Sequence, residues 1–231
     1  MRAPISVVIP TLNAEAPLTD CLTALMEGLD AGLIRELIIS DGGSDDMTLT
    51  LAEAWGAEIM AGTPSRGGQL QRGCAKAKAE WLLVLHADTR LAPGWTGPVI
   101  AHLRGAKAGW FQLQFDQGGL AGKAVAAWAN LRSRLGLPYG DQGLLLPRHL
   151  YQSVGGYPDQ PLMEDVALVR ALRGQLVGLE VTAVTSADKY MRQGWLRRGS
   201  RNLWTLIRYF AGSPRPNWPR DMLNRQRCRL D

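Results

Sequence analysis

The sequence is poor in cysteine and has no long apolar run. Its three cysteines, Cys21, Cys74 and Cys228, are widely separated and lack Cys-x-x-Cys or Cys/His ligand spacing. An odd and scattered set of thiols argues against a disulfide framework and against a structural zinc site. No apolar stretch approaches the roughly 18 residues that cross a bilayer, and the segment 5–10 is too short and poorly flanked for a signal peptide. We therefore expect a cytoplasmic protein.

Acidic residues are scarce at the C-terminal end. From Tyr190 onward there are ten arginines but only Asp221 and Asp231, a balance of +8 in a chain whose total is +5. The basic character is therefore a property of this segment. A basic segment suits nucleic acid, an anionic membrane or the phosphates of a substrate, and its charge alone does not choose among them.

Apolar runs alternate with helical patterns in the first half. We expect strands at 5–10, 36–40, 58–61 and 81–86, a helix from Pro17, and further helices at 47–55 and 67–78. This alternation predicts an α/β fold with a parallel sheet covered by helices. With 231 residues and 46% hydrophobic composition, the chain can bury one sizeable core, so we expect a single domain.

The pattern after Pro93 is mixed. We expect strands at 109–115 and 143–147, one or two short strands within 176–185, and helices at 120–135, 164–173 and 195–211. The last helix carries the apolar stripe Leu196, Leu203, Trp204, Ile207 and Phe210. Within the single domain 1–231 we expect a nucleotide-binding half (1–95), an acceptor half (96–190) and a basic C-terminal helix and tail (191–231).

Three aspartates, Asp41, Asp88 and Asp165, lie at or near the ends of apolar runs. Ligands of open α/β sheets bind beyond the carboxyl ends of the strands, so these carboxylates are expected to face one crevice. A nucleotide, a divalent cation and an acceptor hydroxyl each have a use for one carboxylate. The arrangement indicates a transferase that acts on an activated, diphosphate-bearing donor.

Polar side chains occupy the loops after the first two strands. Thr11, Asn13 and Glu15 are placed to hydrogen-bond a ribose or a base edge, and a turn with a helix cap explains them equally well. In the second loop, two glycines allow close backbone approach, and Asp41 can accept from a pyrimidine imide or a ribose hydroxyl. We interpret this pair of loops as a nucleoside site.

The third loop carries His86 and Asp88. A diphosphate leaving group needs charge neutralisation, and Mg²⁺ or Mn²⁺ takes one or two carboxylates together with phosphate oxygens, which suits Asp88. His86 is a candidate second ligand, and an ordinary partly buried histidine is the competing interpretation. Arg66, before a glycine pair and an expected helix start, is either a phosphate contact or a solvated side chain.

Taken together, the segments PTLNAE, DGGSDD, LLVLHADT and MED resemble family-2 nucleotide-sugar glycosyltransferases of GT-A fold, over residues 5–165 and more loosely the basic tail. The resemblance implies a mostly parallel sheet flanked by helices. It also implies a nucleoside site, a cation held by a DxD-type element against the diphosphate, and a general base in the ED pair. The matching positions are Thr11, Asn13, Glu15, Asp41, Asp88, Glu164 and Asp165. His86 stands where the family usually has a second metal carboxylate.

The stretch 130–143 narrows the resemblance. NLRSR followed by LPYGDQG is similar to a compact bacterial subgroup labelled arsenosugar biosynthesis or selenodomain-associated glycosyltransferases, which implies a small acceptor. Tyr139, Asp141 and Gln142 offer polar groups on a glycine-flanked loop that can orient a sugar or an acceptor, with a structural turn as the alternative.

The reaction predicted from these residues is a single displacement that inverts the anomeric carbon. Asp165 takes the proton of the acceptor hydroxyl, while a metal at Asp88 and nearby cations stabilise the leaving diphosphate. Glu164 orients this base or binds the acceptor. The alternative for Asp165 is a helix cap. The expected partners are a nucleotide-sugar donor and a small or lipid-linked acceptor. We do not expect a nucleic-acid partner, because nucleic-acid binding would not explain the acidic strand ends.

Some alternatives stay open. A nucleotidyltransferase uses a similar fold but should carry a Gly-rich, basic loop after the first strand, and a non-catalytic sugar-nucleotide-binding protein would use the same site. The basic helix after Trp195 is either a lid over donor phosphates, a peripheral contact with the inner face of a membrane, or a solvated face. We expect the segment 214–219 to be irregular.

Overall fold

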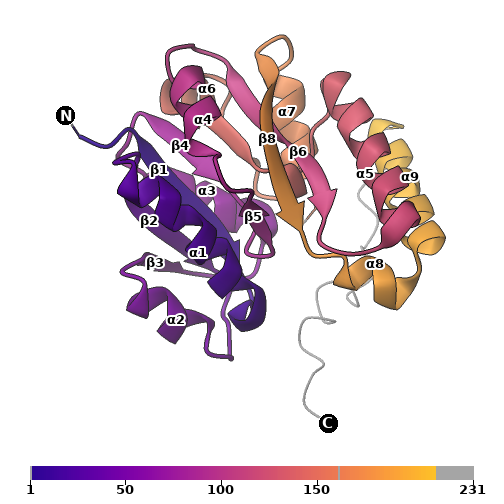
Figure 1. The fold of residues 1–231 in the computed structure, drawn as a ribbon, viewed down its shortest axis with the longest axis horizontal. Helices are drawn as coiled ribbons and strands as arrows, with labels where there is room; N and C mark the ends of the chain where they lie inside the picture. The colour runs from indigo at the N-terminus through magenta and orange to yellow at the C-terminus, as the bar shows by residue number, and fades with distance from the viewer. Residues whose placement is uncertain (1, 161, 212–231) are drawn as a thin grey trace.

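The structure, a computed structural model, describes residues 2–160 and 162–211. Its centre is an eight-stranded sheet in the order β3-β2-β1-β4-β7-β6-β8-β5 (Figure 1). The strands are β1 (Ile5–Thr11), β2 (Ile34–Asp41), β3 (Glu58–Ala61), β4 (Trp81–Val84), β5 (Thr89–Leu91), β6 (Ala108–Phe115), β7 (Leu144–Pro147) and β8 (Leu176–Thr185). The expected α/β fold with a mostly parallel sheet is confirmed.

Strand direction explains where the loops meet. β1 pairs in parallel with β2 and β4, and β2 with β3; β6 pairs in parallel with β8. β7 is antiparallel to β4 and β6, and β5 is antiparallel to β8. The loop that precedes β7 therefore reaches the same edge of the sheet as the carboxyl ends of β1, β2 and β4. This edge gathers loops from both halves of the chain.

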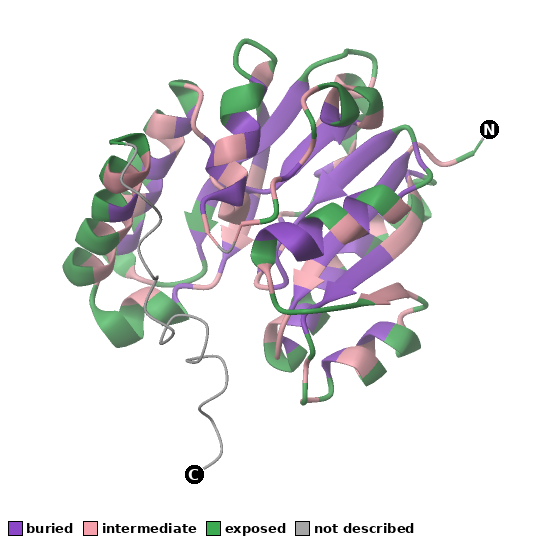
Figure 2. Cartoon of the chain, turned by 180° about the vertical axis from the view of Figure 1, so that it is seen from behind, coloured by how far each residue is buried: buried purple, intermediate pink, exposed green. Residues whose placement is uncertain are grey.

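Helices cover both faces of the sheet. The helices α1 (Glu15–Asp30), α2 (Thr48–Ala54) and α4 (Thr96–His102) pack on one face in a core that includes Leu22, Ile39 and Trp95. The helices α3 (Arg66–Lys76), α6 (Arg148–Ser153) and α7 (Glu164–Ala171) cover the other face, around Leu70 and Leu168. Figure 2 shows the buried sheet between these partly exposed layers.

A third, smaller core lies beside β6. The helix α5 (Gly119–Arg134) packs on Leu113 and Phe115 of that strand. The helices α8 (Asp188–Gln193) and α9 (Trp195–Phe210) follow β8, and Tyr190 and Trp195 join the same cluster. In Figure 1, α5 and α9 lie side by side at one end of the molecule.

Several boundaries differ from the sequence-based expectations. The strand expected at 81–86 ends at Val84, and α1 starts at Glu15 rather than Pro17. The segment 176–185 forms one ten-residue strand, because it pairs with β6 along its length and with β5 near its end. The short elements β5, α4, α6 and α8 carry too few residues to show a period, and we did not expect them.

In the part of the chain that the structure describes, no helix has the length and apolar character needed to cross a membrane. Cys21 and Cys74 are buried free thiols, and burial raises the pKa of each to about 12. Cys228 and the expected irregular segment 214–219 lie outside the described residues.

Candidate active site

The carboxylate of Asp41 orders the loop after β2. It is fully buried at the end of β2, where Asp41 is the register partner of Thr11 on β1. Its Oδ1 accepts from Thr11 Oγ1 (2.8 Å) and Ser44 Oγ (2.5 Å), and its Oδ2 accepts from the N–H groups of Gly43 (2.6 Å) and Ser44 (2.8 Å). These four bonds use the acceptor capacity of the carboxylate. A nucleoside that binds Asp41 directly must displace one of these donors.

Asn13 and Glu15 fasten the loop after β1 to the same segment. Asn13 has a positive φ of 50°, and its Oδ1 accepts from the N–H of Asp45 at 2.9 Å. The N–H of Glu15 donates to Asp46 Oδ2 (3.1 Å), and Glu15 Oε2 accepts from the N–H of Met47 (3.3 Å). The two loops therefore form one wall of the crevice. All of the nucleoside-site residues predicted in these loops lie in that wall.

Two residues of α3 that we did not single out also support the wall. Gln69 is buried, and its Nε2 donates to the carbonyls of Thr11 (2.7 Å) and Ser40 (2.9 Å). Arg72 Nη2 donates to the carbonyl of Asp41 at 3.2 Å. The sequence offered one sign of this role for Gln69: it lies beside Leu70 on the buried side of a predicted helix, and a buried amide needs polar partners.

The Asp88 carboxylate faces a cation in this structure. Lys189 Nζ on α8 lies 2.9 Å from Asp88 Oδ2. Burial works against ionisation of Asp88, but Lys189, His86 and Arg66 together outweigh that effect, and the pKa of Asp88 falls to about 2. The carboxylate is therefore charged and attracts cations. Lys189 gave no signal in the sequence, since it lies 101 positions from Asp88.

His86 lies against Arg66. Arg66 Nη2 is 2.8 Å from His86 Nε2 and 3.0 Å from Nδ1. Burial, together with the Arg66 charge, lowers the pKa of His86 to about 3, so the ring is neutral. The other side of the ring meets the backbone at Gly140, where an added Cβ would stand 2.6 Å from His86 Nε2. Metal ligation by His86 stays a prediction.

Arg66 connects the two halves of the crevice. Its Nε lies 3.1 Å from Glu164 Oε1, whose side chain is only 2% exposed. Desolvation opposes the charge on the guanidinium, but surrounding carboxylates outweigh it and raise the pKa of Arg66. These carboxylates are Glu164, Asp165, Asp88 and Asp141. Arg66 is therefore the central cation of the crevice.

Glu164 is held as a buried acid beside a second carboxylate. Burial, and next the charge of Asp165, raise the pKa of Glu164 to about 7, although Arg66 acts in the opposite direction. Met163 precedes it with a positive φ of 63°, a backbone conformation that starts α7 abruptly after the loop. The turn directs Glu164 into the interior toward Arg66.

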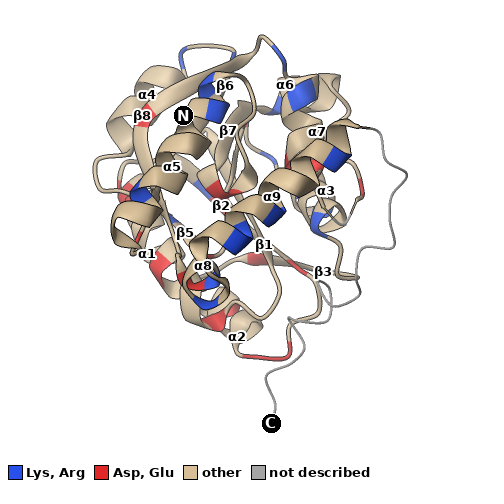
Figure 3. Ribbon diagram, turned by 90° about the vertical axis from the view of Figure 1, so that its right-hand side faces the viewer, with Lys and Arg blue, Asp and Glu red and all other residues tan. Residues whose placement is uncertain are grey.

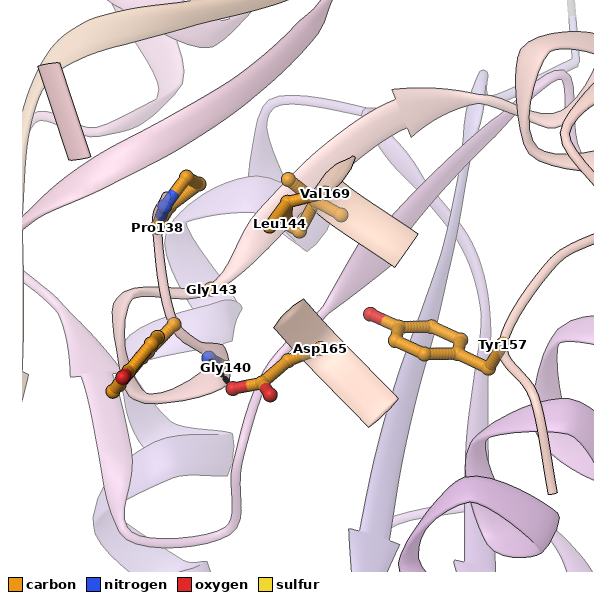
Figure 4. A pocket seen from close by; sticks show the side chains of 8 residues that line it. Pro138, Gly140, Gly143, Leu144, Tyr157, Asp165 and Val169 are labelled. Atoms are coloured by element: carbon orange, nitrogen blue, oxygen red, sulfur yellow. Dashed lines mark hydrogen bonds between the residues drawn. The ribbon is translucent and has the colours of Figure 1, made fainter. Parts of the chain in front are cut away.

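Asp165 lies beside the loop that precedes β7. Its Oδ2 accepts from the N–H of Gly140 at 2.7 Å, and its Oδ1 accepts from the N–H of Val166 at 2.7 Å. Figure 4 shows Asp165 between Gly140 and Tyr157 in a small pocket. The pocket is lined by Pro138, Tyr139, Gly140, Gly143, Leu144, Tyr157, Asp165 and Val169. Asp165 is thus both near its helix start and at a concave surface.

The three predicted acceptor residues lie around the short helical turn Gly140–Gln142. Arg132 lies over the Tyr139 ring, 3.2 Å from its centroid, and burial raises the pKa of Tyr139 to about 12. Asp141 Oδ1 is buried and has no hydrogen-bond partner among the described residues. Gln142 is fully buried and binds interior groups, including Ser133 Oγ at 2.6 Å. The geometry favours Gln142 as a support for the loop rather than an acceptor contact.

Binding of a divalent cation at this site would depend on few protein ligands. Among residues 2–160 and 162–211, no group of three or more His, Cys, Asp and Glu side chains is arranged to hold a metal. Mg²⁺ and similar ions need no such group when substrate phosphates and waters supply the other ligands. Asp88 is a candidate ligand of this kind, and in this structure its Oδ2 pairs with Lys189 Nζ at 2.9 Å.

The sequence matches a known family over the part of the chain that builds the crevice wall. Residues 6–132, more than half of the chain, match the family described as Glycosyl transferase family 2. The chain belongs to this family. The match includes the loops after β1, β2 and β4, together with Arg66.

Curated relatives are similar over part of the chain. A PGL/p-HBAD biosynthesis glycosyltransferase of Mycobacterium tuberculosis is 35% identical over 99 residues, which are 39% of this chain and 38% of the relative. Glucosyl-3-phosphoglycerate synthase of the same organism is 32% identical over 93 residues, which are 36% of this chain and 28% of that protein. The chain thus spans less than two fifths of the length of these relatives.

Solved structures share the fold. A crystal structure of the M. tuberculosis glucosyl-3-phosphoglycerate synthase in complex with Mn²⁺, UDP and phosphoglyceric acid has a TM-score of 0.57 and 22% identity, covering 80% of this chain and 69% of that one. A structure of S. aureus TarS residues 1–349 has a TM-score of 0.57 and 14% identity, covering 78% of this chain and 57% of that one. These similarities support the GT-A fold.

Proposed function

We propose that this protein transfers a sugar from a nucleoside diphosphate sugar to an acceptor hydroxyl, with inversion at the anomeric carbon. The observation that carries the proposal is the set of carboxylates around Arg66, which come from the β4 end, the loop before β7 and the start of α7. A charged donor diphosphate and a reacting hydroxyl need opposite electrostatic environments within a few ångströms. This crevice combines cations and carboxylates in that way.

Asp165 is the proposed general base. The Gly140 N–H bond fixes its carboxylate and leaves lone pairs for an acceptor hydroxyl proton. Glu164, paired with Arg66, is the proposed positioning residue, because it is nearly inaccessible and has a raised pKa. The adjacent carboxylates therefore have different tasks.

Asp88 is the proposed ligand of Mg²⁺ or Mn²⁺, with His86 as a nearby candidate. The ion, when bound, would stabilise negative charge on the leaving diphosphate. The solved relative in complex with Mn²⁺ and UDP supports this assignment by analogy. Arg66 is the proposed second positive group at this end of the crevice.

The wall formed by Thr11, Asn13, Glu15 and Asp41 is the proposed nucleoside site. Its side chains are largely occupied by one another, so we propose that they act by holding the loop backbone in shape for the base and ribose. Preorganised loops lower the entropy loss on binding. Asp41 is then a positioning residue of this site.

On the acceptor side, Asp141 supports the choice of a small hydroxylated acceptor. Its buried and unpartnered Oδ1 is satisfied if a sugar or acceptor hydroxyl donates to it. Tyr139 would lie beside that hydroxyl. A small acceptor agrees with the subgroup of arsenosugar biosynthesis or selenodomain-associated enzymes that the segment 130–143 resembles.

The test is a thermal-shift screen of nucleoside diphosphates with Mg²⁺ or Mn²⁺, followed by measurement of nucleoside diphosphate release from the matching sugar nucleotide. Ligand at 100 times its Kd stabilises the native state by about 2.7 kcal/mol. The proposal is supported if a nucleoside diphosphate binds and if an acceptor accelerates its release from the sugar nucleotide. Binding without turnover favours a non-catalytic protein, formation of a sugar nucleotide favours a nucleotidyltransferase, and no binding refutes all three.

We also propose that the exposed side of α5 and α9 rests on an anionic membrane surface. The two helices contain seven Lys and Arg residues and no acidic residue. Their exposed apolar side chains are Leu120, Trp128, Leu131, Leu196, Leu203, Trp204, Ile207 and Phe210. Figure 3 shows the basic positions of α9 on this side of the molecule.

The two kinds of side chain on α9 form adjacent stripes. Positions 196, 203, 207 and 210 share one helix face, and Arg197, Arg201 and Arg208 follow the neighbouring face. Apolar and basic stripes side by side are typical of helices that lie in a membrane interface, where each Lys or Arg near an anionic surface contributes about 1 kcal/mol. The location would suit a lipid-linked acceptor.

Co-sedimentation with vesicles of phosphatidylglycerol or phosphatidylcholine tests this surface. We expect the full chain to bind the anionic vesicles, a double variant Trp204→Ser with Ile207→Ser to bind at least fivefold less, and Leu29→Ser, an exposed residue of α1, to bind normally. No binding by the unmodified protein refutes the membrane contact. A dimer that the double variant dissolves assigns the surface to a second copy instead.

A single functional unit of 1–231 is the proposed organisation, with nucleotide (1–95) and acceptor (96–190) halves and a basic C-terminal part (191–231). The continuous sheet and the contact of Arg66 with Glu164 across the halves support a single unit.

A further inference from the structure

The contact between Asp88 and the segment that runs from the end of β8 into α8 is more extensive than one ion pair. Besides Lys189 Nζ at 2.9 Å from Oδ2, the N–H of Ser186 donates to the Asp88 carbonyl at 3.1 Å, and Thr185 Oγ1 donates to the same carbonyl at 3.3 Å. The end of β8 and the loop after β4 are therefore joined. Lys189 is presented to the carboxylate by a fixed backbone.

The neighbouring residue anchors that backbone. The Tyr190 ring stacks on Trp195 with centroids 4.9 Å apart and meets Phe115 edge-on at 5.0 Å. Tyr190 therefore holds α8 in the third core beside β6, whereas the Lys189 side chain is 61% exposed. A lysine ammonium sits on a flexible four-carbon stem. It can change partner without movement of the helix.

Lys189 and a divalent cation compete for one carboxylate. Asp88 is the single carboxylate of the segment His86–Ala87–Asp88, and the ammonium lies within hydrogen-bond distance of its Oδ2. A metal at about 2.1 Å from the same oxygen would bring three positive charges against one negative charge. Metal binding therefore favours departure of Lys189 from Asp88.

A donor diphosphate supplies the ammonium with a new partner. Its oxygens would lie on the metal, next to Asp88, and so within the reach of a side chain that already touches Asp88. Lysine is a common point-charge ligand of phosphate. Before the donor binds, Lys189 neutralises Asp88. After the donor binds, the metal neutralises Asp88 and Lys189 neutralises the diphosphate.

We propose that Lys189 is a further donor-binding residue, which neutralises Asp88 in the free protein, yields this carboxylate to the divalent cation and then binds the donor diphosphate. The inference rests on the proposed function, because it requires a diphosphate donor and a cation at Asp88. It gives α8 a role in donor binding that is separate from the surface of α5 and α9.

Two binding measurements on the full chain test the exchange. In Lys189→Met, which removes the ammonium but keeps most of the stem, we expect Mn²⁺ alone to bind at least threefold tighter, measured by electron paramagnetic resonance. We expect UDP, GDP or ADP, whichever binds best, to bind about tenfold weaker with saturating Mn²⁺, measured by calorimetry. The opposite signs separate exchange from simple damage to the site.

Two variants serve as controls. Lys189→Arg keeps the charge and should stay within threefold of the unmodified protein in both measurements. Lys107→Met removes an exposed lysine just before β6, at the opposite edge of the sheet, and should change neither. Thermal unfolding of each variant checks that the fold is kept.

The outcomes distinguish this inference from the proposed function. If the unmodified protein binds Mn²⁺ and a nucleoside diphosphate and Lys189→Met binds both equally well, the exchange is refuted and the function stands. Weaker Mn²⁺ binding in Lys189→Met also refutes it, because removal of a competitor cannot weaken the metal. If the unmodified protein binds no nucleoside diphosphate, the function and the exchange both fail.

Discussion

Replacement of Asp165 by asparagine separates the base role from a structural role. A positioned general base accelerates a reaction about 10² to 10⁴-fold, equivalent to about 3 to 5 kcal/mol of activation free energy. The amide of an asparagine side chain cannot take a proton near neutral pH, so turnover of Asp165→Asn should fall about 10² to 10⁴-fold. A residue that merely caps α7 would affect stability and leave turnover largely intact.

The same substitution has a cost in stability that the structure allows us to estimate. The Asp165 carboxylate accepts from two backbone N–H groups, those of Gly140 and Val166. An asparagine keeps one oxygen for one donor and turns its NH₂ toward the other. One lost bond with an unsatisfied N–H amounts to about 1 to 3 kcal/mol in the free energy of unfolding. Urea unfolding measures this separately from activity.

The assay for Asp165→Asn is release of nucleoside diphosphate from the sugar nucleotide that the unmodified protein uses, at saturating donor and Mn²⁺. Donor affinity should stay within about threefold, because the base contacts the acceptor side. Asp30→Asn, with the same charge change at the exposed end of α1, is the matched control. Turnover of Asp165→Asn within threefold of the unmodified protein would refute the assignment.

Three further variants test the support of the site. Because the pKa of Glu164 is raised, the native state keeps a proton on it between about pH 4.5 and 7, and the stability of the unmodified protein falls by up to about 3 kcal/mol as the pH rises through this range. Glu164→Gln should flatten this pH dependence in urea unfolding. Equal pH dependence in the variant and the unmodified protein would contradict this. Gly67→Ala should lower the free energy of unfolding by about 1 to 3 kcal/mol, because the added Cβ would collide with the Pro158 carbonyl oxygen. Gly97→Ala is the control: a Cβ there would have no neighbour within 4 Å, and this variant should lose no stability. Gln69→Met removes the side-chain donor that joins the Thr11 and Ser40 carbonyls, and it should weaken nucleoside diphosphate binding as measured by calorimetry. Unchanged affinity would show that the wall does not depend on Gln69.

The parts of the fold that the sequence predicted are those with a strong local signal. The runs at 5–10 and 36–40 are the interior strands β1 and β2, and they were recognisable because strands covered on both faces are mostly apolar. Helices such as α5 were expected from their periodicity. The three-residue strand β5 carries no such signal, and it exists because β8 extends far enough to pair with it.

The sequence singled out Asp41, Asp88 and Asp165, but it did not predict their partners. Asp41 was expected to accept from a pyrimidine imide or a ribose hydroxyl, and in this structure four donors of the chain already bind its carboxylate. Those donors depend on the path of the loop after β2, which glycine content does not determine. Likewise, Arg66 and Glu164 are far apart in sequence, and their contact arises from the packing of α3 on α7.

His86 illustrates why a departure from a family pattern is best considered with its neighbours. The ring lies between Arg66 and the backbone of Gly140, and it is neutral. A carboxylate at this position would lie beside the Arg66 guanidinium and compete with Glu164 for it. A neutral imidazole leaves the charge of Arg66 available to Glu164, which keeps the ED pair in place. Asp88 is then the one carboxylate of the segment His86–Ala87–Asp88, and the ammonium of Lys189 balances its charge in this structure.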